Sequence, residues 1–182
     1  MKLLTYKVGC LINALGAGEI NAGAQQCNAS NRMRSGIAPL LADAWPQIRR
    51  ADQNLSSYLT PAQILGRYSS CELSDGVTFY NLYGQLHWSQ SKVEPTRNTN
   101  YAKLAQALQL MTDDLLAKHE ASECHVGIPL IGCGLAGGDW DIVQKLVHDT
   151  LVVAGIRVTV YVLTESVLRK LTKPTDGLFS SR

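Results

Sequence analysis

The chain has 182 residues, of which 46% are hydrophobic and 18% charged, and its formal net charge is +2. This length and composition suit a single soluble α/β domain with a full hydrophobic core. The small charge gives no strong signal for nucleic-acid binding, and the sequence has neither a membrane-spanning apolar run nor the apolar core of a signal peptide. We therefore expect a cytoplasmic protein with no membrane partner.

The cysteines are five in number and scattered along the chain. None has a CxxC or similar spacing of the kind that binds a metal ion. In a reducing compartment such residues behave as small buried hydrophobes. The sequence therefore predicts no metal site, and nothing in it requires a cofactor.

The first third of the chain alternates strand-like and helix-like segments. Residues 3–8 form a β-rich opening, and residues 20–28 are a plausible second strand. A helical repeat of apolar residues starts at Ser35 and ends or bends at Pro46. The pattern predicts further helix over residues 47–59.

The middle of the chain is predicted to contain two strands and the longest helix. Residues 64–72 and 77–83 have strand-like composition and are joined by a good hairpin turn at 74–76. A long helix with an Asn or Thr cap is predicted over residues 98–119.

The last third adds a strand at 125–130, a helix at 141–154 and a strongly apolar strand at 157–163. Strands that alternate with helices predict a three-layer α/β/α domain around a central mixed sheet. We expect residues 1–170 to form this one domain and the polar residues 171–182 to form a loose C-terminal tail.

The most informative segment is residues 128–140, IPLIGCGLAGGDW, where a glycine-rich loop lies between a predicted strand and a predicted helix. A helix N-terminus presents free backbone N–H groups and the positive end of the helix dipole, which suits a phosphate. Glycine lets the backbone approach a ligand closely and adopt positive φ. The alternative is an ordinary strand-to-helix turn that happens to be rich in glycine.

A second segment, residues 27–38 with the sequence CNASNRMRSGIA, also follows a strand and leads into a helix. The amides of Asn28 and Asn31 offer donors and acceptors that suit ribose hydroxyls, although both residues could instead form the turn. Gly36 repeats the phosphate-binding argument of the first loop. Open α/β sheets bind ligands at the carboxyl ends of their strands, so two such loops meeting there would suit a diphosphate.

These segments resemble the corresponding motifs of macrodomains. The resemblance rests on CNASN followed by SGIA, on IPLIGCGLAGGDW, on NLYGQ at 81–85 and RNTNY at 97–101, and on the opening YKVGCLIN at 6–13. The last three resemble a bacterial and phage branch that is ADP-ribose-1''-phosphate phosphatase-like. The similarity covers about residues 3–164.

The resemblance implies that ADP-ribose or a derivative binds in a crevice on top of the sheet. The Ser35–Ala38 loop would hold one side of the diphosphate, and the Gly132–Gly137 loop would hold the other side and the distal ribose. Asn31 would lie against that ribose, with Tyr83 at the rim. The implied ligand-binding residues are Cys10, Leu11, Asn28, Ser35, Gly36, Ile37, Ala38, Tyr83, Ile131, Gly132, Cys133, Gly134, Leu135, Ala136 and Gly137.

The sequence departs from the family pattern at three places. Cys10 stands where the family usually has an aspartate that recognises adenine, so the ligand itself could differ. Ala136, with Gly84 or Gln85, replaces the Asp and Lys of the branch that removes ADP-ribose covalently. Gln25 stands where a phosphatase branch has its catalytic His.

The resemblance implies hydrolysis of ADP-ribose-1''-phosphate to ADP-ribose by a positioned water. Asn31 would orient the substrate, and Asp139 would be the base, because a carboxylate at a helix N-terminus is stabilised as the anion. Asp139 could instead be a helix cap. Cys133 could be activated by the helix dipole or could be packed under its loop. The alternatives are a non-catalytic reader of ADP-ribose or of ADP-ribosylated macromolecules, and a hydrolase acting on modified protein or nucleic acid.

Overall fold

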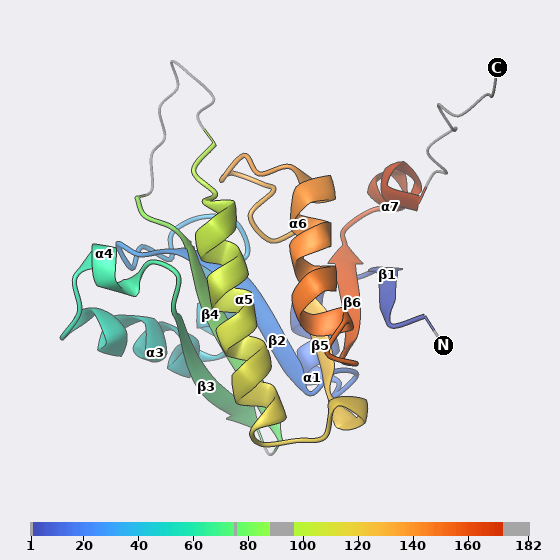
Figure 1. Ribbon diagram of the computed structural model, residues 1–182, viewed down its shortest axis with the longest axis horizontal. Helices are drawn as coiled ribbons and strands as arrows, with labels where there is room; N and C mark the ends of the chain where they lie inside the picture. The colour runs from blue at the N-terminus through green and yellow to red at the C-terminus, as the bar shows by residue number, and fades with distance from the viewer. Residues whose placement is uncertain (1, 75, 88–96, 173–182) are drawn as a thin grey trace.

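The computed structural model describes residues 2–74, 76–87 and 97–172 (Figure 1). Its centre is a six-stranded mixed sheet in the order β1-β6-β5-β2-β4-β3. Neighbouring strands run parallel, except that β3 is antiparallel to β4. The strands are β1 (Leu4–Val8), β2 (Ala22–Asn28), β3 (Tyr68–Ser74), β4 (Val77–Gln85), β5 (His125–Ile128) and β6 (Arg157–Val162).

One face of the sheet is covered by α5 (Tyr101–Leu116) and α6 (Trp140–Val147), which lie in front of it in Figure 1. Helix α6 continues into a π-helical turn at His148–Val152. Because side chains alternate along a strand, every second residue of the inner strands points to this face. The resulting core contains Ala22, Ala24, Tyr80, Leu82, Val126, Ile128, Val158 and Val160.

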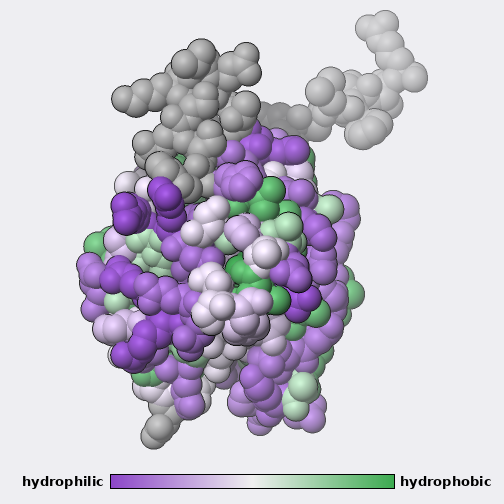
Figure 2. Space-filling view, turned by 90° about the vertical axis from the view of Figure 1, so that its left-hand side faces the viewer, coloured by the Kyte–Doolittle hydropathy of each residue, from purple (hydrophilic) through white to green (hydrophobic). Residues whose placement is uncertain are grey.

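The opposite face is covered by α1 (Leu11–Gly16), α2 (Ala38–Ala44) and α3 (Pro46–Ser56). Helix α3 buries Ile48 and leaves polar residues such as Arg49, Arg50 and Gln53 exposed. The surface that Figure 2 presents, on the side where α3 lies in Figure 1, is mainly hydrophilic. The two covered faces confirm the three-layer α/β/α architecture.

Two expected boundaries are wrong. The strand expected over 64–72 begins only at Tyr68, because Pro61–Ile64 forms the short helix α4, whose N-terminus is capped by reciprocal bonds between Thr60 and Gln63. The helix expected from Ser35 begins at Ala38.

Two more helices, besides α4, were not expected. The first is α1, which buries Leu11, Ala14 and Leu15 against the sheet. The second is α7 (Glu165–Thr172), whose Leu171 packs on the core, so the expected loose tail at 171–182 is helical in its first two residues. The rest of that tail, residues 173–182, lies outside the described residues. A short 3₁₀ turn at Ala121–Glu123 precedes β5, and within the described chain no helix has the length and apolarity to cross a bilayer.

Gly127 in β5 gives the clearest test of this packing. A Cβ there would overlap Cδ1 of Ile20 and would lie 2.9 Å from Cδ1 of Leu11, so alanine overpacks the layer between α1 and the sheet. We expect Gly127→Ala to lower the free energy of unfolding by about 1–3 kcal/mol in a urea titration. Gly16→Ala is the matched control, because its Cβ has no neighbour within 4 Å and should cause no loss of stability.

Candidate ligand-binding cavity

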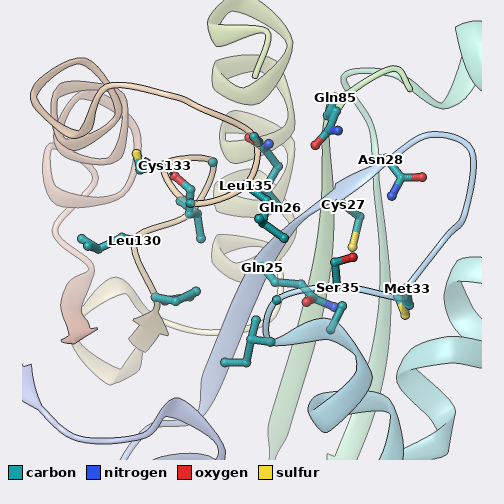
Figure 3. Close-up of a pocket in the computed structure, with 18 of the residues that line it drawn as sticks. Gln25, Gln26, Cys27, Asn28, Met33, Ser35, Gln85, Leu130, Cys133 and Leu135 are labelled. Carbon is teal, nitrogen blue, oxygen red and sulfur yellow. Dashed lines mark hydrogen bonds between the residues drawn. The ribbon is translucent and has the colours of Figure 1, made fainter. Parts of the chain in front are cut away.

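A cavity of about 930 Å³ opens at the carboxyl ends of the parallel strands (Figure 3). Three connections form its walls, namely those that follow β2, β5 and β6, while the end of β4 contributes Gln85. The β2–α2 and β5–α6 connections lie on opposite sides of strand β2 in Figure 3. The topology therefore brings together the two loops that the sequence singled out, as the rule for open α/β sheets predicts.

The floor of the cavity is the end of strand β2, with Gln25, Gln26 and Cys27 (Figure 3). Gln25 is 2% exposed, and its Nε2 donates to Oδ1 of the buried Asn81 at 2.9 Å. Burial raises the pKa of the Cys27 thiol well above its usual range. The floor therefore presents amides and an un-ionised thiol.

The glycine loop after β5 is held in shape by the segment just before α5. The N–H groups of Asn98 and Thr99 both donate to the Ala136 carbonyl, at 2.8 and 3.1 Å. Within the loop, Gly138 N donates to Gly132 O at 2.8 Å, and a Cβ at Gly138 would lie 2.5 Å from that same oxygen. Gly132 itself has φ +72°, a conformation that favours glycine.

Thr99 joins this loop to the floor. Its Oγ1 donates to Gly132 O at 2.6 Å and accepts from Gln26 Nε2 at 3.1 Å. The Gln26 carboxamide packs closely against the loop, since a Cβ at Gly132 would lie 2.6 Å from Gln26 Oε1. It packs equally closely against β4, where a Cβ at Gly84 would lie 2.7 Å from the same oxygen. Glycine is thus required at 132 both by backbone conformation and by the space that Gln26 occupies.

Three residues of the segment RNTNY at 97–101 hold neighbouring parts of the structure in place. Thr99 holds the loop, and Asn100 caps α5 by accepting a bond from Lys103 N. The Tyr101 hydroxyl accepts from Asp139 N at 2.8 Å, and so connects the start of α5 to the start of α6. These contacts place the glycine loop independently of any ligand.

Several backbone N–H groups of the cavity walls remain available to a ligand. Within the described residues, the N–H groups of Gly134, Leu135 and Ala136 have no acceptor, and neither do those of Gly36 and Ile37 on the other wall. Free N–H groups on both sides of a cavity form an anion-binding arrangement. The cavity can therefore hold an elongated anion such as a diphosphate between its two walls.

The wall formed by the β2–α2 connection is ordered by asparagine side chains. Asn28 Nδ2 donates to Arg32 O at 3.0 Å, and Asn28 Oδ1 accepts from Arg32 N at 3.2 Å. Asn31 Nδ2 donates to both the main-chain oxygen and Oδ1 of Asp52, each at 2.8 Å. The Asn28 amide therefore makes turn-forming bonds, whereas the Asn31 amide bonds to α3. Contact of either amide with a ribose stays a prediction.

Eleven of the residues singled out from the sequence line the cavity. They are Asn28, Ser35, Gly36, Ile37, Ala38, Ile131, Gly132, Cys133, Gly134, Leu135 and Ala136.

Six others lie outside the cavity lining, and the physical reasons differ. Tyr83 is fully buried, with its hydroxyl on Asp52 and Ser69. Asn31 is turned toward α3, and Asp139 is the exposed N-cap of α6, accepting from Asp141 N. The remaining three are Cys10, which precedes α1, Leu11, which is buried in α1, and Gly137 at the far end of the glycine loop.

Cys133 lines the cavity without being a reactive thiol. Burial, followed by the nearby charge of Asp139, raises its pKa to about 12. Its Sγ donates to Ile131 O at 3.2 Å, and Figure 3 shows the sulfur directed away from the floor residues Gln25 and Gln26. The packed alternative therefore describes this residue, and helix-dipole activation does not.

Sequence reasoning missed other parts of the lining. Two of the missed side chains are the exposed cations Arg32 and Arg34, and a third is Gln85 at the end of β4. The strand β6 and helix α7 add an apolar end through Leu163 and Val167, beside Leu130. Arg32 and Arg34 lie inside the segment 27–38, and Gln85 lies inside the segment 81–85, so their position in these motifs was the usable signal. In the described part of the chain, no group of His, Cys, Asp and Glu could hold a metal ion.

Comparison with known proteins identifies the fold. No protein-family model matches the sequence. An uncharacterized 17.5 kDa protein from the tk-vs intergenic region of Enterobacteria phage T4 is 28% identical over 126 residues, which span 68% of this chain and 75% of that protein. A macrodomain protein from Streptomyces coelicolor has a TM-score of 0.66 and 25% identity, over 87% of this chain and 98% of that one.

The structure of Thermosipho africanus DarTG in complex with ADP-ribose has a TM-score of 0.65 and 18% identity, over 88% of this chain and 42% of that one. Together with the sheet order and the two helical layers, these similarities show that the chain has the macrodomain fold. The narrower resemblance to the ADP-ribose-1''-phosphate phosphatase-like branch stays a prediction.

Thr99 provides a direct test of how the glycine loop is held. Thr99→Val keeps the shape of the side chain but leaves Gln26 Nε2 without its partner and leaves Gly132 O with the bond from Gly138 N alone. We expect the free energy of unfolding to fall by about 1–3 kcal/mol and amide hydrogen exchange to accelerate at residues 132–138. Thr99→Ser retains the hydroxyl and should keep most of the protection. Equal behaviour of the two variants would show that the hydroxyl does not hold the loop.

Proposed function

We propose that this chain binds ADP-ribose or a close derivative in the cavity at the carboxyl ends of its strands. The observation that carries the proposal is the set of free backbone N–H groups on both walls, at Gly134–Ala136 and at Gly36 and Ile37. A diphosphate placed between them would receive hydrogen bonds from both sides. The exposed cations Arg32 and Arg34 favour the same negative charge.

The two ends of the cavity differ in chemistry, and this difference supports a nucleotide-like ligand. The end near β6 and α7 is lined by apolar groups of Leu130, Leu163 and Val167, which suit the flat faces of a base. The floor and the β4 side present the amides of Gln26 and Gln85, which suit sugar hydroxyls. DarTG from Thermosipho africanus has the same fold and was solved with ADP-ribose, which supports this choice of ligand.

Among the proposed activities, binding without turnover has the strongest support. Of the described residues that line the cavity, none is His, Lys or Glu, and the one carboxylate belongs to Asp52. Asp52 is 1% exposed, and its Oδ1 already accepts two hydrogen bonds. This set of groups favours a reader of ADP-ribose or of ADP-ribosylated macromolecules.

Hydrolysis of ADP-ribose-1''-phosphate stays a prediction of the sequence. The two residues given roles in it, Asn31 and Asp139, lie outside the cavity lining, so a substrate water would have to be oriented by backbone groups or amides instead. Release of inorganic phosphate from ADP-ribose-1''-phosphate would support the phosphatase. Release of ADP-ribose from a modified protein or nucleic acid would support the hydrolase.

The binding proposal is tested by calorimetric titration with ADP-ribose. Gly134 is exposed, its φ is not positive, and no atom lies within 4 Å of a Cβ at this position, so Gly134→Glu should fold normally and place a carboxylate beside the free N–H groups. We expect the parent chain to bind and the variant to bind at least about tenfold more weakly, a loss of about 1.4 kcal/mol or more.

Gly134→Ala is the matched control and should retain binding, because it adds a methyl group without charge. No heat of binding from the parent chain at millimolar ADP-ribose would contradict the proposal. Direct titration with other nucleotide sugars would then reveal whether Cys10, in place of the adenine-recognising aspartate, marks a changed ligand.

A further inference from the structure

Among the non-glycine residues that the structure describes, only Asn31 has a positive φ. Its φ is +54°, in the left-handed region that asparagine enters more readily than most residues. Its N–H donates to Asn28 O at 3.1 Å, which closes the turn after β2. Asn31 therefore sets the direction of the wall that continues through Arg32 to Gly36.

The side chain of Asn31 is engaged behind this wall. Its Nδ2 donates to the main-chain oxygen and to Oδ1 of Asp52, a residue of α3 that is 1% exposed. Tyr83 donates its hydroxyl proton to the same Oδ1 at 2.8 Å. Because that proton is committed to Asp52, Ser69 is the donor in its 2.9 Å bond with Tyr83.

The chain of bonds continues to the floor of the cavity. Asn81 Nδ2 donates to Ser69 Oγ at 3.1 Å, and Asn81 Oδ1 accepts from Gln25 on β2. The wall at Asn31 and the floor at Gln25 are thus connected through buried side chains of β3, β4 and α3.

We propose that Asp52 is a positioning residue that fixes the β2–α2 wall through its bonds with Asn31. The wall residues 29–37 form neither helix nor strand, so side-chain bonds must supply their order. Burying a carboxylate without a cationic partner is costly, and its second oxygen, Oδ2, has no partner among the described residues. Hydrogen bonds from Tyr83 and Asn31 to Asp52 Oδ1 offset that cost. The Asn31 bond forms only while the wall holds Asn31 next to Asp52.

The first test does not depend on any ligand. Arg32 and Arg34 are exposed in this wall, so trypsin can cleave after each of them if the wall loosens. Asn31→Gly keeps a residue that adopts positive φ but removes both bonds to Asp52, and we expect cleavage at these two sites under native conditions to become about tenfold faster. Asp52→Asn keeps an oxygen acceptor at Oδ1 and should stay within about twofold of the parent chain.

Asn21→Gly is the matched control. Asn21 also makes two side-chain bonds to main-chain groups, Glu123 O and His125 N, but at the opposite end of the sheet. It should leave cleavage at Arg32 and Arg34 unchanged. An equal increase in this control, or no increase in Asn31→Gly, would overturn the proposal, because loosening would then be global or absent.

The second test rests on the proposed function and measures ADP-ribose affinity by calorimetry. Positioning predicts that Asn31→Gly and Asp52→Leu each weaken binding about tenfold and that the double variant is no weaker than either one. Independent roles of the two residues predict losses that add, which would contradict positioning. A loss of affinity in Asp52→Asn as large as that in Asp52→Leu would also contradict it, because asparagine keeps the oxygen acceptor. If the parent chain fails to bind ADP-ribose, the proposed function fails, while the cleavage result still decides the role of Asp52.

Discussion

The parallel pairing of β2 with β4 on one side and β5 on the other decides where the ligand-facing segments of this chain lie. Parallel neighbours end at the same edge of a sheet, so the connections that follow β2 and β5 meet there although about a hundred residues separate them. Each connection is ordered from behind before a ligand arrives. Thr99 and Ala136 order the glycine loop, and Asn31 with Asp52 orders the other wall.

Buried polar groups around the cavity are tolerated because nearly all of them have partners. The chain from Gln25 through Asn81, Ser69 and Tyr83 to Asp52 satisfies side chains that would each cost about 1–3 kcal/mol if left unpaired. The network stiffens the floor and one wall together. Rigid walls reduce the conformational ordering that ligand binding would require.

Much of the fold was predictable from the sequence, because hydrophobic periodicity reports directly on strands and helices. The long helix α5 and the apolar strand β6 were found for that reason, whereas the loop after β5 was found from its glycine content. Helix α1 was missed because six residues carry too little periodicity. Helix α7 was missed because its polar residues outweigh the few that pack on the core.

The cavity was predictable only where the backbone carries the chemistry. Glycines at 132, 134 and 36 indicated a candidate ligand loop, and all three line the cavity. The orientation of a side chain depends on partners far away in the sequence, as Asn31 shows by turning to Asp52, twenty-one residues later. The resemblance to macrodomains implies a ribose contact for Asn31, which stays a prediction, but no pattern in the sequence indicated the bonds to Asp52.

The central claim is that the two glycine-containing walls form one anion-binding site for ADP-ribose. It is tested most directly by following backbone amide resonances while ADP-ribose is added to the isotope-labelled protein. The claim predicts saturable shifts at Gly36 and Ile37 together with Gly134–Ala136, the residues whose N–H groups are free in the structure. Shifts confined to one wall, shifts elsewhere on the molecule, or no shifts at millimolar ligand would contradict it.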